Sequence, residues 1–160
     1  MNVTQTLPKV TAFLQRKHGC FIDGAWVVPE GARTDVLNPA TGQAISSVAD
    51  IDTDLLDQAV KSAHASFKSR VWADLRPADR ERILLRFADL VEANGEELAQ
   101  LETLSQGKSI NIARMLDVGA TVEFMRYMAG WATKIEGQTL NVSIPLPPGA
   151  KFTAYTRREP

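Results

Sequence analysis

The chain has 160 residues, of which 44% are hydrophobic and 23% charged, with a formal net charge of -1. This balance is typical of a soluble globular domain and excludes the basic surface that nucleic-acid binding usually requires. The single cysteine excludes an internal disulfide, and no apolar run approaches the roughly 20 residues of a membrane span. Since the N-terminus carries no apolar leader, we expect a cytoplasmic protein with neither a nucleic-acid nor a membrane partner.

The first 50 residues indicate a short helix followed by β structure. Apolar residues at helical spacing predict a helix over residues 9–17. In the following segment, CFIDGAWVV, the pair Asp23–Gly24 between apolar neighbours is a strong signal for a two-residue hairpin. Residues 35–49 predict two further strands around a turn rich in Asn, Pro and Gly.

The middle of the chain predicts helices with apolar stripes. The first is capped by Asp52 or Thr53 and ends near Ser69, and the second begins at Pro77. An interruption at residues 94–95 divides the second helix, which stops at Gly107 as at a C-terminal cap. A long third helix is predicted over residues 109–135. The expected stripes comprise Leu56, Ala59, Val60, Ala63 and Phe67, then Ile83, Leu84, Phe87, Leu90 and Val91, then Ile112, Met115, Leu116, Gly119, Val122, Met125 and Ala129.

The hydrophobic period changes from helical to alternating after Gly137. Leu140, Val142 and Ile144 alternate with polar residues, residues 145–149 form a turn signal, and residues 151–157 alternate again. This pattern predicts a two-stranded ribbon. Because an isolated ribbon is marginally stable in water, we expect it to pair with another sheet or another chain.

The sequence SQGKS at residues 105–109 ends like a nucleotide-binding phosphate loop. Such a loop needs a glycine five positions before Gly107, where this chain has Glu102, and it must lead from a strand into a helix. Here it follows a helix. We therefore interpret Gly107 as the positive-φ residue of a joint between two helices.

A set of motifs, in the same order along the chain, resembles the NAD(P)-dependent aldehyde dehydrogenase superfamily. The segment LETLSQGKSI resembles the family's Glu-Thr-x-x-x-Gly-Lys pattern before its long third helix. The other motifs are FIDGAW, LNPATGQAISSVA, MRYMAGWATKIEG with its Tyr-x-Ala-Gly-Trp-x-x-Lys helix end, and YTRREP. Within the family, FLQRKHG and the stretch from Leu75 to Ile110 are most similar to phenylacetaldehyde dehydrogenases.

The resemblance implies an α/β fold, of which this chain is the N-terminal segment, containing β-hairpins, three main helices and an oligomerisation ribbon. It implies a helical lead-in over residues 1–19, the hairpin and helical part of the cofactor-binding domain over 20–137, and the ribbon over 138–157. Residues 158–160 would begin the connection to the dinucleotide-binding sheet. That sheet and the catalytic domain are expected outside this chain.

The resemblance further implies oxidation of an aldehyde, aromatic and similar to phenylacetaldehyde, to a carboxylic acid with NAD(P). In the family, a cysteine thiolate attacks the carbonyl and a glutamate activates water, and both residues are expected beyond residue 160. We therefore expect no catalytic or cofactor-binding residue here, NAD being bound by parts outside this chain, and the segment alone to be inactive. Cys20 does not match the nucleophile's position and is interpreted as a small buried apolar residue.

Some residues match functional positions of the family. Leu116 and Ala120 fall at substrate-channel positions, although Leu116 also belongs to the apolar stripe and is equally well explained as a core residue. Val36 and Ser105 match positions whose backbone carbonyls bind a structural monovalent cation. His18 and His64 are interpreted as surface or helix-end residues, and the acidic group Glu92, Glu96 and Glu97 as a solvated helix face.

The partners implied are a small-molecule aldehyde and further copies of the same chain. Residues 139–156 resemble the family's intersubunit ribbon, so a homodimer or homotetramer is expected. The alternative is a free-standing, non-catalytic protein that binds full-length dehydrogenase subunits through the ribbon, and the motif order argues against a generic helical binding module. A continuation with an apolar strand after Pro160 would favour the enzyme. A chain that genuinely stops at Pro160 would favour the alternative.

Overall fold

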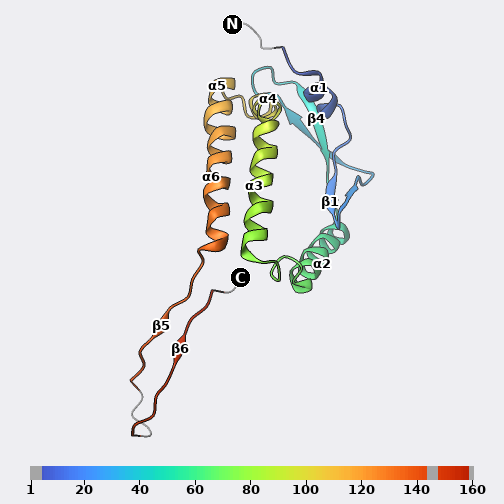
Figure 1. The fold of residues 1–160 in the computed structure, drawn as a ribbon. Coiled ribbons are helices and arrows are strands. Elements are labelled where there is room, and N and C mark those ends of the chain that lie inside the picture. The colour runs from blue at the N-terminus through green and yellow to red at the C-terminus, as the bar shows by residue number, and fades with distance from the viewer. Residues whose placement is uncertain (1–4, 144–147, 159–160) are drawn as a thin grey trace.

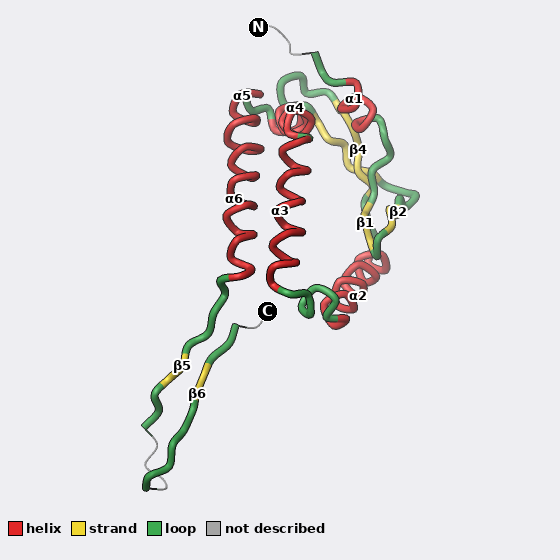
Figure 2. Tube along the Cα trace, in the orientation of Figure 1, coloured by secondary structure: helices red, strands yellow, loops and turns green. Residues whose placement is uncertain are grey.

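The computed structural model describes residues 5–143 and 148–158. Two long helical rods run side by side, with strands and further helices beside one of them, and an extended ribbon projects from the end of the other (Figure 1, Figure 2). The helical elements are α1 (Pro8–Leu14), α2 (Thr53–Ser69), α3 (Pro77–Ala93), α4 (Gly95–Gln106), α5 (Ile110–Ile112), the π-helix η1 (Ala113–Gly119), α6 (Ala120–Ala129) and the 3-10 helix η2 (Gly130–Thr133). The strands are β1 (Cys20–Ile22), β2 (Ala25–Val27), β3 (Arg33–Leu37), β4 (Ala44–Ala49), β5 (Thr139–Leu140) and β6 (Ala154–Tyr155).

The predicted hairpin at Asp23–Gly24 is confirmed. Strands β1 and β2 pair antiparallel, and Asp23 and Gly24 both have positive φ angles, of 51° and 77°. That combination matches the right-handed twist of the flanking strands. Strands β3 and β4 also pair antiparallel, around a turn in which the Asn38 side chain accepts a hydrogen bond from the backbone N–H of Ala40 at 2.9 Å. The β structure predicted for residues 20–49 is therefore present.

Helix α1 ends three residues earlier than predicted. Its last residue is Leu14, whereas the apolar pattern suggested helix to residue 17. The carbonyl of His18 accepts hydrogen bonds from the Ala49 backbone at 3.0 Å and from the Arg33 guanidinium at 3.1 Å. Because these bonds draw His18 against the β3–β4 hairpin, the chain leaves the helix before it reaches that residue.

The predicted ends of α2, α3 and α4 are confirmed. The Asp52 carboxylate caps α2 by accepting the Leu55 N–H at 2.8 Å, and Pro77 lies in the first turn of α3. Helix α4 ends at Gly107, whose φ is 77°. A Cβ at Gly107 would lie 3.2 Å from the ring of Pro39, so the end of α4 packs directly on the β3–β4 turn.

The long apolar stripes are largely uncovered within the described residues. Helices α3 and α6 run antiparallel side by side (Figure 1), and their buried residues are small: Ala88, Val122 and Ala129. The larger stripe residues stay about half exposed, as with Phe67 at 59% and Phe87 at 54%. Small residues let the two helices approach closely, and the larger side chains then lie on outward faces that no described residue covers.

The predicted two-stranded ribbon is confirmed, but its regular pairing is short. Thr139 pairs with Tyr155 and Leu140 with Ala154, while Val142 is extended but unpaired in the described residues. Ile144 and most of the predicted turn lie outside the described residues. The two chain segments lie close together at Gly137, where a Cβ would lie 1.7 Å from the Thr156 carbonyl oxygen. No described helix is both long and apolar enough to cross a membrane.

Candidate functional site

The Gly107–Lys108–Ser109 joint holds an ion bridge instead of a phosphate loop. It links α4 to α5, as the sequence predicted, and the Lys108 ammonium lies 2.9 Å from Glu102 Oε1 and 2.9 Å from Asp117 Oδ2. The hydrogen bonds to Glu102 and Asp117 raise the pKa of Lys108 above its ordinary value. The lysine that a phosphate loop would offer to a nucleotide is therefore engaged by two carboxylates.

The long third helix contains a π-helical segment that the sequence analysis did not predict. Helix η1 occupies Ala113–Gly119, between α5 and α6, where a continuous α-helix was expected. The Thr121 hydroxyl donates a hydrogen bond to the Asp117 carbonyl within this region. A glycine inside an otherwise apolar helical pattern, Gly119, was the available signal. Segments of π-helix occur frequently at functional sites.

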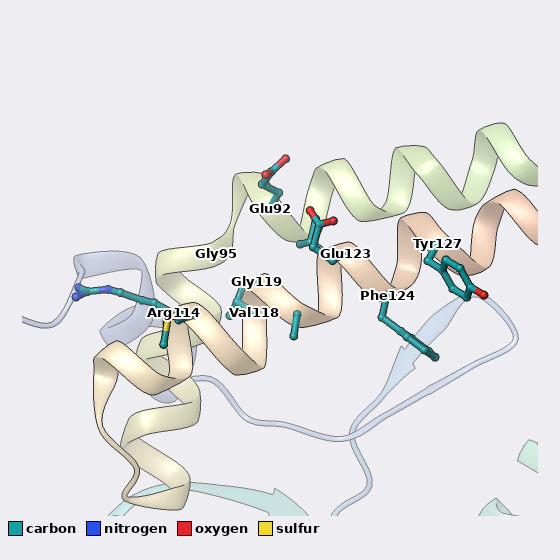
Figure 3. Close-up of a pocket in the computed structure, with 11 residues that line it drawn as sticks. Glu92, Gly95, Arg114, Val118, Gly119, Glu123, Phe124 and Tyr127 are labelled. Carbon is teal, nitrogen blue, oxygen red and sulfur yellow. The ribbon is translucent and has the colours of Figure 1, made fainter.

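Two surface hollows lie along η1 and α6. The first, of about 910 Å³, is bordered by Glu92, Gly95, Arg114, Met115, Val118, Gly119, Ala120, Val122, Glu123, Phe124 and Tyr127. In Figure 3, Phe124 and Tyr127 extend from α6 on the side away from α3. The second, of about 680 Å³, is bordered by Val91, Leu98, Glu102, Leu116, Asp117, Val118, Ala120, Thr121, Phe124 and Met125.

The structure brings the two predicted channel residues together. Leu116 and Ala120 both line the second hollow, and Ala120 also borders the first. Leu116 is 55% exposed among the described residues, and both interpretations of it, as a channel residue and as a core residue, stay open. The apolar side chains of Leu98, Phe124 and Met125 complete a surface suited to an apolar ligand. The channel role itself stays a prediction.

The prediction that Glu92, Glu96 and Glu97 form a solvated helix face fits Glu92, whose side chain is 60% exposed, whereas the side chains of Glu96 and Glu97 are partly covered. Each carboxylate meets a cation from another element: Glu92 meets Arg126 at 2.6 Å, Glu96 meets Arg114 at 2.7 Å, and Glu97 meets Lys9 at 2.8 Å.

Two of these ion pairs carry pKa shifts. Hydrogen bonds from Arg114 and Gln100 lower the pKa of Glu96 below its ordinary value of 4.5. Hydrogen bonds to Glu92 and Asp89 raise the pKa of Arg126. The ion pairs of these carboxylates tie α3 and α4 to η1, α6 and the lead-in.

The lone cysteine and the two histidines form no catalytic group with one another. Cys20 is a half-buried free thiol in β1, so it is less buried than predicted. His64 is exposed on α2, as expected, but His18 is half-buried, with its ring 4.6 Å from that of Phe13 and its Nε2 buried without a hydrogen-bond partner. Within residues 5–143 and 148–158, His, Cys, Asp and Glu side chains form no metal-ligand cluster.

The two candidate carbonyl ligands lie on two elements, β3 and α4, whose following residues, Pro39 and Gly107, are in contact. Val36 is in β3, opposite Ser46, and Ser105 is in the last turn of α4, where its hydroxyl donates to the Leu101 carbonyl at 2.9 Å. Carbonyls of a last helical turn have no partner within the helix. The contact between Gly107 and Pro39 holds these elements together, and cation binding by Val36 and Ser105 stays a prediction.

Comparisons with known proteins give a consistent family. The model of the aldehyde dehydrogenase family matches residues 26–160. The phenylacetaldehyde dehydrogenase of Pseudomonas fluorescens is 45% identical over all of this chain and 32% of that protein, and the putative aldehyde dehydrogenase DhaS of Bacillus subtilis is 43% identical over 98% of this chain and 30% of that protein.

Solved structures agree with the sequence matches. A mutant aldehyde dehydrogenase of Bacillus cereus superposes with a TM-score of 0.88 at 41% identity, over 98% of this chain and 31% of that one. An NAD+ complex of a Bacillus cereus aldehyde dehydrogenase superposes with a TM-score of 0.83 at 40% identity, over 96% of this chain and 30% of that one. The chain spans about a third of the length of these relatives and corresponds to their N-terminal segment. With the motifs and the α/β fold in agreement, the chain belongs to the aldehyde dehydrogenase family.

Proposed function

We propose that this chain is the N-terminal part of an NAD-dependent dehydrogenase that oxidises an aromatic aldehyde, similar to phenylacetaldehyde, to its carboxylic acid. The reaction consumes the aldehyde, water and NAD+ and yields the acid, NADH and a proton. The observation that carries the proposal is the 45% identity to a phenylacetaldehyde dehydrogenase along the whole of this chain.

The contribution of this segment is a wall of the path along which the aldehyde approaches. Leu116 and Ala120 line one hollow and supply apolar surface, and the methyl group of Ala120 leaves space beside it for an aromatic ring. Phe124 borders the same hollow and offers a ring surface against which another ring can pack.

The chemical steps are assigned to other parts of the enzyme. No nucleophile with an adjacent base is present among the described residues, so the segment alone is expected to be inactive. The described residues also contain no glycine-rich turn from strand to helix, and Lys108 is engaged by carboxylates. These residues do not fit a dinucleotide site, so NAD binding belongs to the remainder of the enzyme.

The ribbon is the proposed contact between subunits. Strands β5 and β6 form a two-stranded sheet, and in the described residues each pairs only with the other. Open strand edges favour pairing with another chain, which supports a homodimer or homotetramer in the cytoplasm. The alternative is a free-standing protein that binds full-length dehydrogenase subunits through these same edges.

Two measurements test the proposal. The first is the intact mass of the protein in its source cells: a species much heavier than 17.6 kDa that begins with this sequence supports the enzyme, and one at 17.6 kDa supports the alternative. The second is NADH formation by the purified protein with phenylacetaldehyde, acetaldehyde and a buffer blank. Turnover of neither aldehyde by a full-length species would overturn the proposal.

A further inference from the structure

Three separate segments meet at the Lys108 ammonium. Glu102 belongs to α4, Lys108 to the joint after it, and Asp117 to the π-helix η1. The ammonium lies 2.9 Å from the Glu102 carboxylate and also donates a hydrogen bond to Asp117 Oδ1 at 3.0 Å. The three side chains are each about one third exposed, so they are partly shielded from water. The bridge therefore fixes the position of η1 against the end of α4.

The π-helical register of η1 decides how Leu116 is turned relative to Ala120. A π-turn contains an additional residue compared with an α-turn, so returning this segment to α-helix would rotate the residues before it by about 100° relative to those after it. Helix α6 cannot follow such a rotation freely, because Val122 and Ala129 are buried and Arg126 is paired with Glu92 of α3. The rotation would be taken up by the residues of η1, including Leu116.

Gly119, at the end of η1, has no side chain at the point where this register brings a backbone carbonyl close. A Cβ at this position would lie 3.3 Å from the carbonyl oxygen of Arg114, five residues earlier. The missing side chain therefore leaves space for a carbonyl at π-helical spacing. The ion bridge at Asp117 and the absence of a side chain at Gly119 both favour the π-helical register of the same turn.

We infer that Asp117, held by Lys108, is a positioning residue for aldehyde specificity. It keeps η1 in the register that presents Leu116 beside Ala120 in the second hollow, whose border also includes Glu102 and Asp117. The inference rests on the proposed function, since it assigns this hollow to the aldehyde. Neither carboxylate takes part in the chemistry, and their effect on the substrate passes through Leu116.

The test compares variants of the full-length dehydrogenase with two aldehydes. Asp117→Asn removes the charge and keeps the shape of the side chain, and we expect kcat/KM for phenylacetaldehyde to fall roughly tenfold relative to that for acetaldehyde, mainly through KM. Lys108→Met should do the same, and Lys108→Arg, which keeps the cation, should retain most of the ratio. The matched control is Glu97→Gln, which breaks an ion pair of α4 away from both hollows and should leave the ratio unchanged.

Gly119→Ala provides a second route to the same answer. This substitution alters the turn of η1 without touching the ion bridge, so it should also lower kcat/KM for phenylacetaldehyde relative to that for acetaldehyde. If Asp117→Asn does not fold, the result for Gly119→Ala decides whether the register of η1 affects specificity. An unchanged ratio in these variants, or an equal loss for both aldehydes, would overturn the inference and leave the proposed function intact. A wild-type enzyme that oxidises neither aldehyde would overturn the proposed function, and this inference with it.

Discussion

The backbone N–H of Leu7 donates a hydrogen bond to Oε1 of Gln100 at 2.9 Å, across 93 residues of sequence. Gln100 is buried in α4, and its Nε2 donates in turn to Glu96 Oε1 at 2.8 Å. Glu96 holds Arg114 of η1, so a single buried amide connects the N-terminal lead-in to the helix that borders both hollows.

Replacing that amide should loosen the lead-in. Gln100→Ala leaves the Leu7 N–H without its acceptor, a loss of about 1–3 kcal/mol for a buried group. We expect hydrogen exchange of the backbone amides of α1 to accelerate by roughly 5- to 150-fold, as measured by mass spectrometry on the full-length enzyme. The matched control is Gln106→Ala, at the exposed end of the same helix, and equal exchange rates in the two variants would contradict the prediction.

The Glu96–Arg114 pair should make part of the stability sensitive to acid. Because the folded-state pKa of Glu96 lies below its ordinary value of 4.5, its contribution is present above that pH and is lost as the pH falls through the folded pKa. Glu96→Gln should therefore flatten the fall of the unfolding midpoint between about pH 6 and pH 3. The measurement is denaturant unfolding at a series of pH values.

A matched control for this pH experiment is Glu123→Gln. Glu123 is 81% exposed and lies 3.9 Å from its nearest cation, so its replacement should leave the pH profile as in the wild type. A Glu96→Gln profile parallel to the wild type would show that Arg114 does not stabilise the ionised carboxylate.

The ribbon should not tolerate a side chain at Gly137. A Cβ there would lie 1.7 Å from the Thr156 carbonyl oxygen, so Gly137→Ala must separate the two segments at a cost of about 1–3 kcal/mol. The proposed intersubunit contact should weaken, which sedimentation equilibrium would detect as a shift toward smaller species. Gly130→Ala is the control, because its nearest neighbour is the flexible Lys134 ammonium at 3.4 Å, and dissociation of both variants alike would argue against a specific role for the ribbon.

The space beside Ala120 should select for the aromatic ring. Ala120→Trp fills the second hollow, so KM should rise more for phenylacetaldehyde than for acetaldehyde in the full-length enzyme. The corresponding change at an exposed alanine of α2, Ala65→Trp, should alter neither KM. Equal effects of Ala120→Trp on KM for both aldehydes would show that Ala120 does not line the substrate path.

The features that could be predicted from sequence are those that local backbone chemistry decides. Asp23–Gly24 requires positive φ angles, Asp52 offers an oxygen to a free N–H, and Gly107 has the conformation with which helices end. Each of these signals lies within a few residues of its effect, and the structure confirms all three.

The features that were not predicted depend on contacts between residues that are far apart in the sequence. Apolar spacing along residues 109–135 follows the α-helical period, so the extra residue in η1 was not predicted. The pairing of Glu92 with Arg126 joins positions 34 residues apart, which no local pattern indicates. Apolar stripes likewise identify the hydrophobic face of a helix without showing which residues cover that face. The carbonyls of Val36 and Ser105 carry no side-chain signal, so their role stays a prediction.

The packing of the small residues between α3 and α6 also determines the direction of the ribbon. The ribbon begins a few residues after η2, which follows directly on α6 (Figure 2). From Tyr155, the partner of Thr139, to Pro148 the described ribbon acts as a lever arm of up to about 24 Å at the usual rise per residue of a strand. A tilt of about 11° at the helix pair would move Pro148 by about 4.7 Å, close to one full strand spacing. An enlarged side chain at Ala88 or Ala129, both fully buried, would therefore displace the remote end of the ribbon and with it the proposed contact between subunits.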